Sequence, residues 1–211
     1  MNLRGRLDRS RLYVVSGARP DLPEFLDAIL GEGVDVIQLR QKEAEAGDLL
    51  RWGEMFRETA TRHDGLFIVN DRPDVAGALG ADGVHLGQND LPPAVARQIL
   101  GPESIIGWST HSQEQWDAAP ADADYLCAGP VWETPTKPGR RATGLDYLRY
   151  AAKSSERRPW FAIGGINESN VPEVVDAGAT RIVVVRAVTE AEDPGAAVRA
   201  LLDRLPSGAR S

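Results

Sequence analysis

Eight short runs of aliphatic and β-branched residues recur along the chain, and each is followed directly by polar, charged or glycine residues. The runs are residues 12–15, 34–39, 66–69, 83–86, 105–108, 123–127, 160–163 and 182–185. Segments with helical spacing separate most of them, at residues 23–31, 48–63, 91–100, 112–119, 145–152, 168–177 and 194–205. Parallel strands need crossovers of about a dozen residues or more, which these segments provide.

This repeated alternation predicts the α/β class and a closed, parallel (β/α)8 TIM barrel. The alternative is an open doubly wound sheet, but such a sheet needs blunted or covered edge strands, and no run has that character. Asp48 and Asn167 are placed to cap helices at their N-termini. Gly31, Gly80 and Gly178 stand where left-handed helix ends are expected.

The length of 211 residues is typical of one large α/β domain. No linker or low-complexity tract divides the chain, so we predict a single domain over residues 1–211, with loose termini at 1–11 and 206–211. The longest irregular stretch covers residues 129–143. A loop of that length inside a compact domain is more often functional than idle.

The formal net charge of -7 argues against a nucleic-acid partner, because such binding normally requires a basic surface. The positive charges are nevertheless gathered at the ends of the predicted strands. They are Arg40, Lys42, Arg72, Lys137, Arg140, Arg141 and Arg186. An acidic chain with one local cationic pocket is suited to small phosphorylated substrates.

The single cysteine, Cys127, cannot form an internal disulfide, and it lies in an apolar run where a small buried residue is expected. The first residues are charged, and no run approaches the roughly 18 apolar residues that span a bilayer. We therefore expect a cytoplasmic protein without a membrane partner. The sequence leaves a homo-oligomer open.

Polar side chains at the end of the second run form the first candidate group. Alternation would place Gln38, Arg40 and Lys42 on one side, where an amide, a guanidinium and an ammonium suit an anion with several oxygens. The alternative is a strand end that simply frays into solvated charges.

Two acids follow neighbouring runs and form the second candidate group. Asp71 lies beside Asn70 after the third run, and Asp90 follows the fourth. Two carboxylates with room for water and substrate phosphates match the coordination of Mg2+. The alternative is that both acids only cap the helices expected to begin at Pro73 and Leu91.

The residues that follow the fifth, sixth and seventh runs provide hydroxyls, a cation and paired glycines. They are Ser109-Thr110-His111 after the fifth run, Thr134, Thr136 and Lys137 after the sixth, and Gly164-Gly165 after the seventh. Paired glycines let backbone N–H groups approach a phosphate, and barrels commonly bind phosphate after strands seven and eight. His63 and His85 have no partner at zinc spacing, so a structural role is predicted for both.

Read in order, six motifs resemble thiamine-phosphate synthase over nearly the whole chain. They are Gln38-Leu39-Arg40-Gln41-Lys42, Asn70-Asp71-Arg72, His85-Leu86-Gly87-Gln88-Asn89-Asp90, Gly107-Trp108-Ser109-Thr110-His111, Thr134-Pro135-Thr136-Lys137 and Ala162-Ile163-Gly164-Gly165-Ile166. The resemblance implies a transferase that joins 4-amino-2-methyl-5-hydroxymethylpyrimidine diphosphate to 4-methyl-5-(2-hydroxyethyl)thiazole phosphate. The implied products are thiamine phosphate and diphosphate, and the implied cofactor is Mg2+.

The resemblance also implies roles for individual residues. Asp71 and Asp90 would hold Mg2+, while Gln38, Arg40, Lys42, Asn70 and Lys137 would surround the pyrimidine diphosphate, with Ser109 beside the diphosphate or the reacting centre. Thr134, Thr136, Gly165, Val185 and Arg186 would form the thiazole phosphate site. Within this set, Arg40, Lys42, Ser109 and Lys137 would be catalytic.

One departure and two alternatives remain. The family often has a Ser in the short motif after strand eight, where this chain reads Val184-Val185-Arg186-Ala187. Arg140 and Arg141 have no assigned role. A related thiazole tautomerase of the same fold needs no diphosphate clamp, so the charged set counts against it. A non-catalytic thiamine-phosphate sensor is the alternative from another class.

Overall fold

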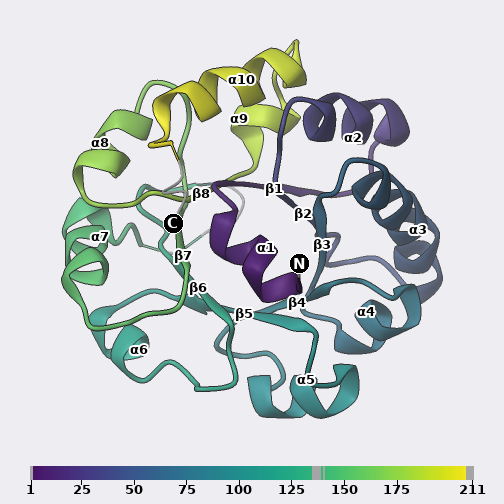
Figure 1. Ribbon diagram of the computed structural model, residues 1–211, viewed down its shortest axis with the longest axis horizontal. Coiled ribbons are helices and arrows are strands. Elements are labelled where there is room, and N and C mark those ends of the chain that lie inside the picture. Colours follow the sequence, from purple (N-terminus) through teal and green to yellow (C-terminus); the bar gives the residue numbers. More distant parts are fainter. Residues whose placement is uncertain (1, 135–138, 140, 208–211) are drawn as a thin grey trace.

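A closed barrel of eight parallel strands forms the centre of the molecule, which confirms the predicted (β/α)8 class. The computed structural model describes residues 2–134, 139 and 141–207 (Figure 1). The strands are β1 (Leu12–Ser16), β2 (Val36–Leu39), β3 (Leu66–Asn70), β4 (Gly83–Leu86), β5 (Ile105–Thr110), β6 (Tyr125–Ala128), β7 (Trp160–Ile163) and β8 (Ile182–Val184). They follow one another in chain order around the ring, and β8 pairs with β1 to close it.

Helices surround the barrel as an outer ring (Figure 1). They are α2 (Leu22–Gly31), α3 (Ala46–Arg62), α4 (Pro73–Leu79), α5 (Pro93–Leu100), α6 (Gln113–Asp117), α7 (Gly144–Lys153), α8 (Val171–Asp176) and α10 (Pro194–Arg204). A short helix, α9 (Arg186–Thr189), follows β8 directly, where no helix is predicted from the sequence.

Alternation along the strands divides the apolar residues into two cores. On β1, Val14 packs outward against the helices, whereas Tyr13 and Val15 belong to the cluster inside the barrel. The outer core includes the stacked pair Phe56 and Phe67, with ring centroids 5.6 Å apart, which joins α3 to β3. Because both faces of every strand are covered, the runs read as continuously apolar segments, as is usual for parallel sheets.

The N-terminal segment is ordered, which corrects the prediction of a loose stretch at residues 1–11. Residues Leu3–Arg9 form helix α1, which lies across one end of the barrel (Figure 1). Its Leu7 is 1% exposed and belongs to the inner core. Arg4 and Arg6 bond to Pro102 and Asp64, which precede β5 and β3, so α1 closes the end where the strands begin. The opposite end remains available for a site.

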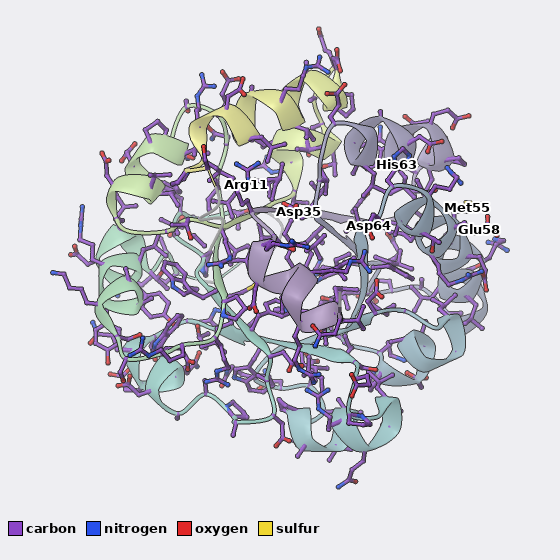
Figure 2. All side chains as sticks on the ribbon, in the orientation of Figure 1. Arg11, Asp35, Met55, Glu58, His63 and Asp64 are labelled. Atoms are coloured by element: carbon purple, nitrogen blue, oxygen red, sulfur yellow. The ribbon has the colours of Figure 1, made fainter. Side chains whose placement is uncertain are left out.

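Three aspartates tie neighbouring strands together at the end covered by α1. Asp35, Asp82 and Asp124 stand immediately before β2, β4 and β6. Their carboxylates accept the backbone N–H groups of Leu12, Phe67 and Ile106, at 3.0, 2.8 and 2.8 Å, where the preceding odd-numbered strands begin. Figure 2 shows the first of them, Asp35, near Arg11 and α1. Each aspartate thereby satisfies a backbone donor that no strand ladder pairs.

Several predicted helix ends are wrong in detail. Asp48 lies inside the first turn of α3, whose N-cap is Glu45. Asn167 stands before the N-cap Asn170 of α8 and bonds to Ser169 instead. Gly31 is the last residue of α2 and not a left-handed stop. Gly80 and Gly178 do have positive φ values, of 59° and 100°, as predicted. Among the described residues, no helix is both long enough and apolar enough to span a bilayer.

Candidate active site

The ends of the strands opposite α1 surround three adjoining cavities. The outer cavity is lined by Lys42 and Asp71, and it shares Asn70 with an inner cavity that reaches into the barrel. The inner cavity in turn shares Val185 with a third one, beside β7 and β8. The shared residues place the three cavities next to one another, as expected for side chains at the same end of parallel strands.

Two carboxyl groups meet in the outer part of the site. Asp71 and Asp90 are hydrogen-bonding neighbours, and Lys42 Nζ lies 3.1 Å from Asp71 Oδ2. Asp90 Oδ2 also accepts the Gly87 N–H at 2.7 Å. Neither acid caps a helix, because the N-caps of α4 and α5 are Arg72 and Pro92, without a side-chain cap bond. The capping alternative for the two acids is therefore wrong.

The environment drives the pKa values of these two acids apart. Burial raises the pKa of Asp90, and the neighbouring Asp71 carboxyl adds to the effect. Burial acts in the same direction on Asp71, but contacts with Asp90, Lys42 and Asn70 outweigh it and lower its pKa. Two acids in contact need a shared positive charge, which a divalent cation provides when both are ionised.

No group of three or more His, Cys, Asp or Glu side chains able to hold a metal occurs within the part of the chain that the structure describes. Mg2+ often keeps several waters and binds through one or two carboxylates together with substrate phosphates. Asp71 and Asp90 fit that requirement, with the remaining positions left for water and a diphosphate. The donor set therefore fits a metal that binds together with its substrate.

The inner cavity brings Gln38, Arg40 and Asn70 together from β2 and β3. Burial lowers the pKa of the half-buried Arg40, although the Asp71 carboxylate opposes the shift. Arginine nevertheless stays protonated in proteins. This cavity therefore offers two amides and a fixed cation next to the acid pair. Gln38 and Arg40 share the cavity, as predicted, whereas Lys42, predicted on the same side, lines the outer cavity.

Buried polar side chains that the sequence does not mark as site residues lie next to this cavity. Tyr13 and His85 line it, and Tyr125 lies directly behind them. His85, predicted to be structural, places Nε2 2.8 Å from Ser109 Oγ. Ser109 itself is 4% exposed and sits at the end of β5. In the sequence, only the alternation along each strand could have marked these residues, because all of them face the inside of the barrel.

The third cavity has the features of an anion site. Thr134, Gly164, Gly165, Val185 and Arg186 line it. Gly164 and Gly165 have φ values of 105° and 72°, a conformation that favours glycine. A Cβ built on Gly165 would lie 2.9 Å from the Cβ of Trp132, so the backbone also passes too close for a larger residue.

The two described ends of the loop beside this cavity are bonded to each other. The N–H groups of Thr143 and Gly144 donate to Pro130 and Val131 at 2.7 and 3.1 Å, which closes the described ends of the predicted loop 129–143. His111 Nδ1 lies 2.5 Å from the carbonyl oxygen of Gly129 and joins β5 to the same loop. Thr136, Lys137 and Arg140 lie outside the described residues.

The chain matches a known protein family. A family model described as thiamine monophosphate synthase matches residues 12–188. The chain belongs to this family. It is 52% identical to the thiamine-phosphate synthase of Acidothermus cellulolyticus, covering 98% of this chain and 100% of the relative. It is 54% identical to that of Thermobifida fusca, covering 98% and 97%.

A solved structure shows the same family at lower identity. The thiamine phosphate pyrophosphorylase of Pyrococcus furiosus is 39% identical and superposes with a TM-score of 0.85, covering 96% of this chain and 97% of that chain. The family membership predicted from six short motifs is confirmed over almost the full length.

Proposed function

We propose that this protein is a Mg2+-dependent thiamine-phosphate synthase. The reaction joins 4-amino-2-methyl-5-hydroxymethylpyrimidine diphosphate to 4-methyl-5-(2-hydroxyethyl)thiazole phosphate and releases diphosphate. The observation that carries the proposal is a row of adjoining cavities whose two ends differ in chemistry. An acid pair with Lys42 and Arg40 lies at one end, and the anion site beside β7 and β8 lies at the other.

The end formed by β2 to β4 suits the diphosphate. Asp71 and Asp90 would hold Mg2+, which when bound supplies positive charge to the oxygens of the leaving group. Lys42 and Arg40 add two cations, and Ser109 a hydroxyl. Gln38 and Asn70 would orient the pyrimidine diphosphate in the inner cavity. The predicted contact of Lys137 with the diphosphate belongs to the same proposal.

The end formed by β6 to β8 suits the thiazole phosphate. Thr134 supplies a hydroxyl, Gly165 a closely approaching backbone, and Arg186 a planar guanidinium that matches phosphate oxygens. Val185 lines both this cavity and the inner one, so a thiazole bound here would face the pyrimidine. Thr136 is proposed as a further contact on the phosphate.

The chemistry requires no general base. The C–O bond of the pyrimidine diphosphate breaks with its electron pair on the leaving oxygen, and the amino group of the pyrimidine stabilises the resulting carbocation. The lone pair of the thiazole nitrogen then forms the new C–N bond, and that nitrogen carries no proton to be removed. The task of the protein is thus to neutralise the leaving group and align both partners.

The test is a coupled measurement of diphosphate and thiamine phosphate with the purified protein. Both products should form only when both substrates and Mg2+ are present, and a chelator should stop the reaction until Mg2+ is restored. Conversion of a thiazole carboxylate phosphate without the pyrimidine substrate would favour the tautomerase. Tight binding of thiamine phosphate without turnover would favour the sensor. Neither alternative requires the acid pair with its neighbouring cations.

Arg186→Ala is expected to raise the KM for the thiazole phosphate by about tenfold, with kcat and the KM for the pyrimidine diphosphate changed less than about twofold. Arg186 lines the anion site, and its ion pair with Glu190 is long, at 3.9 Å. Steady-state kinetics with each substrate varied in turn measures the effect. Glu190→Gln is the matched control, since an equal effect there would assign the loss to α9 and not to the phosphate.

A further inference from the structure

A chain of buried hydrogen bonds crosses the interior of the barrel and links two of the proposed site residues. It begins at Gln38 on β2, whose Nε2 donates to the hydroxyl of Tyr13 on β1. The Tyr13 hydroxyl lies 3.1 Å from that of Tyr125 on β6, which lies 3.0 Å from Nδ1 of His85 on β4. The chain ends where His85 Nε2 lies 2.8 Å from Ser109 Oγ on β5.

Strand register explains how His85 and Tyr125 reach each other. Gly107 of β5 stands directly between them, paired with His85 on one side and with Tyr125 on the other. A Cβ built on Gly107 would lie 2.5 Å from His85 Nδ1 and closer still to the Tyr125 ring. The absence of a side chain at this one position therefore lets residues from two non-adjacent strands form a hydrogen bond across β5.

One direction gives every phenol hydrogen in this series of hydrogen bonds an acceptor. The Gln38 amide N–H donates to Tyr13, and each phenol can accept one bond and donate one if Tyr13 donates to Tyr125 and Tyr125 donates to His85 Nδ1. An imidazole whose Nδ1 accepts carries its hydrogen on Nε2. That hydrogen is donated to Ser109 Oγ, so the hydrogen of the Ser109 hydroxyl remains available for another acceptor.

Burial also keeps both phenols able to donate. It raises the pKa of both Tyr13 and Tyr125 above the usual value for a phenol, so both remain protonated donors at neutral pH. Tyr125 also contacts the ring of Phe161, with centroids 5.6 Å apart, which holds it in the inner core. The Tyr125 side chain is 0% exposed, so its hydroxyl does not contact bulk solvent.

We propose that Tyr125 is a positioning residue of the synthase reaction, which holds His85 in the tautomer that leaves the Ser109 hydroxyl free to donate to the departing diphosphate. This inference rests on the proposed role of Ser109 beside the diphosphate. Tyr125 itself touches neither substrate. Its effect passes through His85, and the same chain also holds the amide of Gln38 at the other side of the inner cavity.

Tyr125→Phe keeps the ring and removes only the hydroxyl. We expect kcat to fall by about tenfold, less than the roughly 100-fold or more that loss of a direct transition-state donor costs, with the KM of either substrate changed less than about twofold. Tyr147→Phe is the matched control, because the phenol of Tyr147 is also buried and donates to Thr110 Oγ1, beside Ser109, at 2.7 Å. We expect it to retain kcat within about twofold.

A double-mutant cycle with Ser109→Ala separates this inference from the function on which it rests. We expect Ser109→Ala to lower kcat and Tyr125→Phe to have no further effect in that background. If the two losses multiply, Tyr125 does not act through Ser109 and the inference is wrong, while the role of Ser109 stands. If Ser109→Ala is fully active, the proposed role of Ser109 and the inference fail together.

The nitrogen chemical shifts of His85 give a readout that does not depend on activity. In full-length protein labelled at the imidazole nitrogens, with His85→Gln used for assignment, we expect a hydrogen on Nε2 in the wild type. Tyr125→Phe should shift the ring toward the form with its hydrogen on Nδ1, and Tyr147→Phe should not. A wild-type ring with its hydrogen on Nδ1 would overturn the proposal, whatever the kinetics.

Discussion

Asp71→Asn is expected to lower kcat/KM by about 100- to 1000-fold, because the change removes half of the negative charge that the proposed Mg2+ site provides. The carboxylate contacts Asp90 and lies 3.1 Å from Lys42 Nζ. Asparagine has nearly the same size, and it tolerates the φ of 62° that Asp71 adopts better than most residues do. The backbone at this turn should therefore be kept while the charge is lost.

Thermal unfolding separates a loss of chemistry from a loss of folding in this variant. The ion pair with Lys42 is half exposed on the lysine side, so its removal costs about 0–1 kcal/mol. Relief of the contact with Asp90 offsets part of that cost. Asp74→Asn is the matched control, since this exposed acid on α4 pairs with Arg72 at 2.6 Å, outside the acid pair. If Asp71→Asn lowered Tm so far that unfolding accounts for the lost activity, the acid pair would be structural.

The location of the site was predictable because it depends on a property of every strand at once. Residues that follow parallel strands must meet at one end of the barrel, so Gln38, Asn70 and Gly165 could be placed together without knowledge of any contact. The choice between a cap and a ligand for Asp71 was not predictable. It depends on where α4 begins: the N-cap is Arg72, and Asp71 lies one residue earlier with a positive φ.

The hydrogen-bond chain through Tyr125 was not predictable from the sequence, because register decides it. His85, Gly107 and Tyr125 lie at one level only because three strands pair in a particular alignment, and a shift of one residue would turn each side chain to the other face. Glycine at position 107 has no local explanation in the sequence. Its significance lies in the two side chains that meet over it.

Helix α1 was missed for a related reason. Its sequence is highly charged and has little apolar periodicity, so no local pattern favours a buried position. The charges are instead partners for groups at the ends of distant strands, including Asp124 for Arg4 and the carbonyl of Asp64 for Arg6. A helix held mainly by long-range polar contacts cannot be distinguished from a solvated terminus until those partners are placed.

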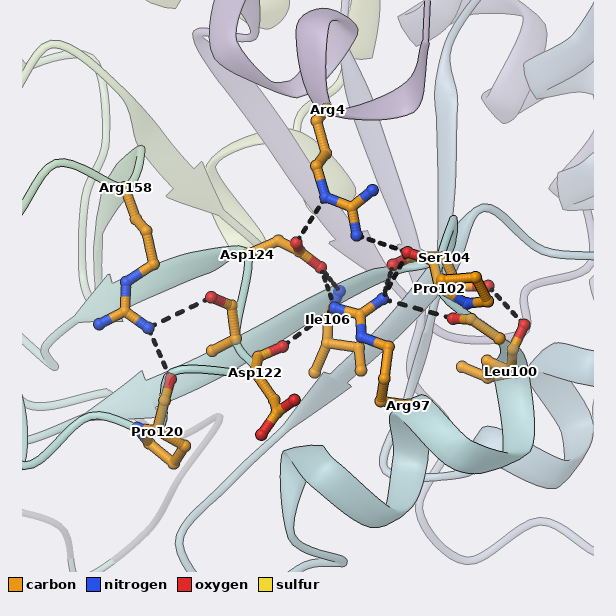
Figure 3. A network of polar contacts seen from close by, with 12 residues as sticks. Arg4, Arg97, Leu100, Pro102, Ser104, Ile106, Pro120, Asp122, Asp124 and Arg158 are labelled. Atoms are coloured by element: carbon orange, nitrogen blue, oxygen red, sulfur yellow. Dashed lines mark hydrogen bonds and ion pairs between the residues drawn. The ribbon is translucent and has the colours of Figure 1, made fainter.

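Asp124 joins this closing helix to the barrel. Its carboxylate accepts Arg4 Nε at 2.8 Å, Arg97 Nη2 at 2.6 Å and the Ile106 N–H at 2.8 Å (Figure 3). Three donors from α1, α5 and β5 thus share one carboxylate whose side chain is 12% exposed. Arg97 also donates to the carbonyl oxygens of Ser104 and Asp122, which fixes the guanidinium in place.

Asp124→Ala is therefore expected to lower the free energy of unfolding by about 3 kcal/mol, the lower end of the range for breaking a buried ion pair, because Arg4 is partly exposed. For a chain of this size that loss corresponds to a fall in Tm of roughly 6–12 °C. Thermal and denaturant unfolding measure it. The activity of the folded fraction should be unchanged, since the network lies at the end of the barrel opposite the site.

Asp122→Ala is the control for this variant. Its exposed side chain lies two residues away in the same turn, and only its backbone carbonyl, which the substitution keeps, accepts from Arg97 (Figure 3). A loss below about 1 kcal/mol in Asp124→Ala would place the network among ordinary surface ion pairs. A large loss confined to Asp124→Ala would instead show that one carboxylate stabilises the closed end of the barrel by satisfying two guanidinium groups and a strand N–H together.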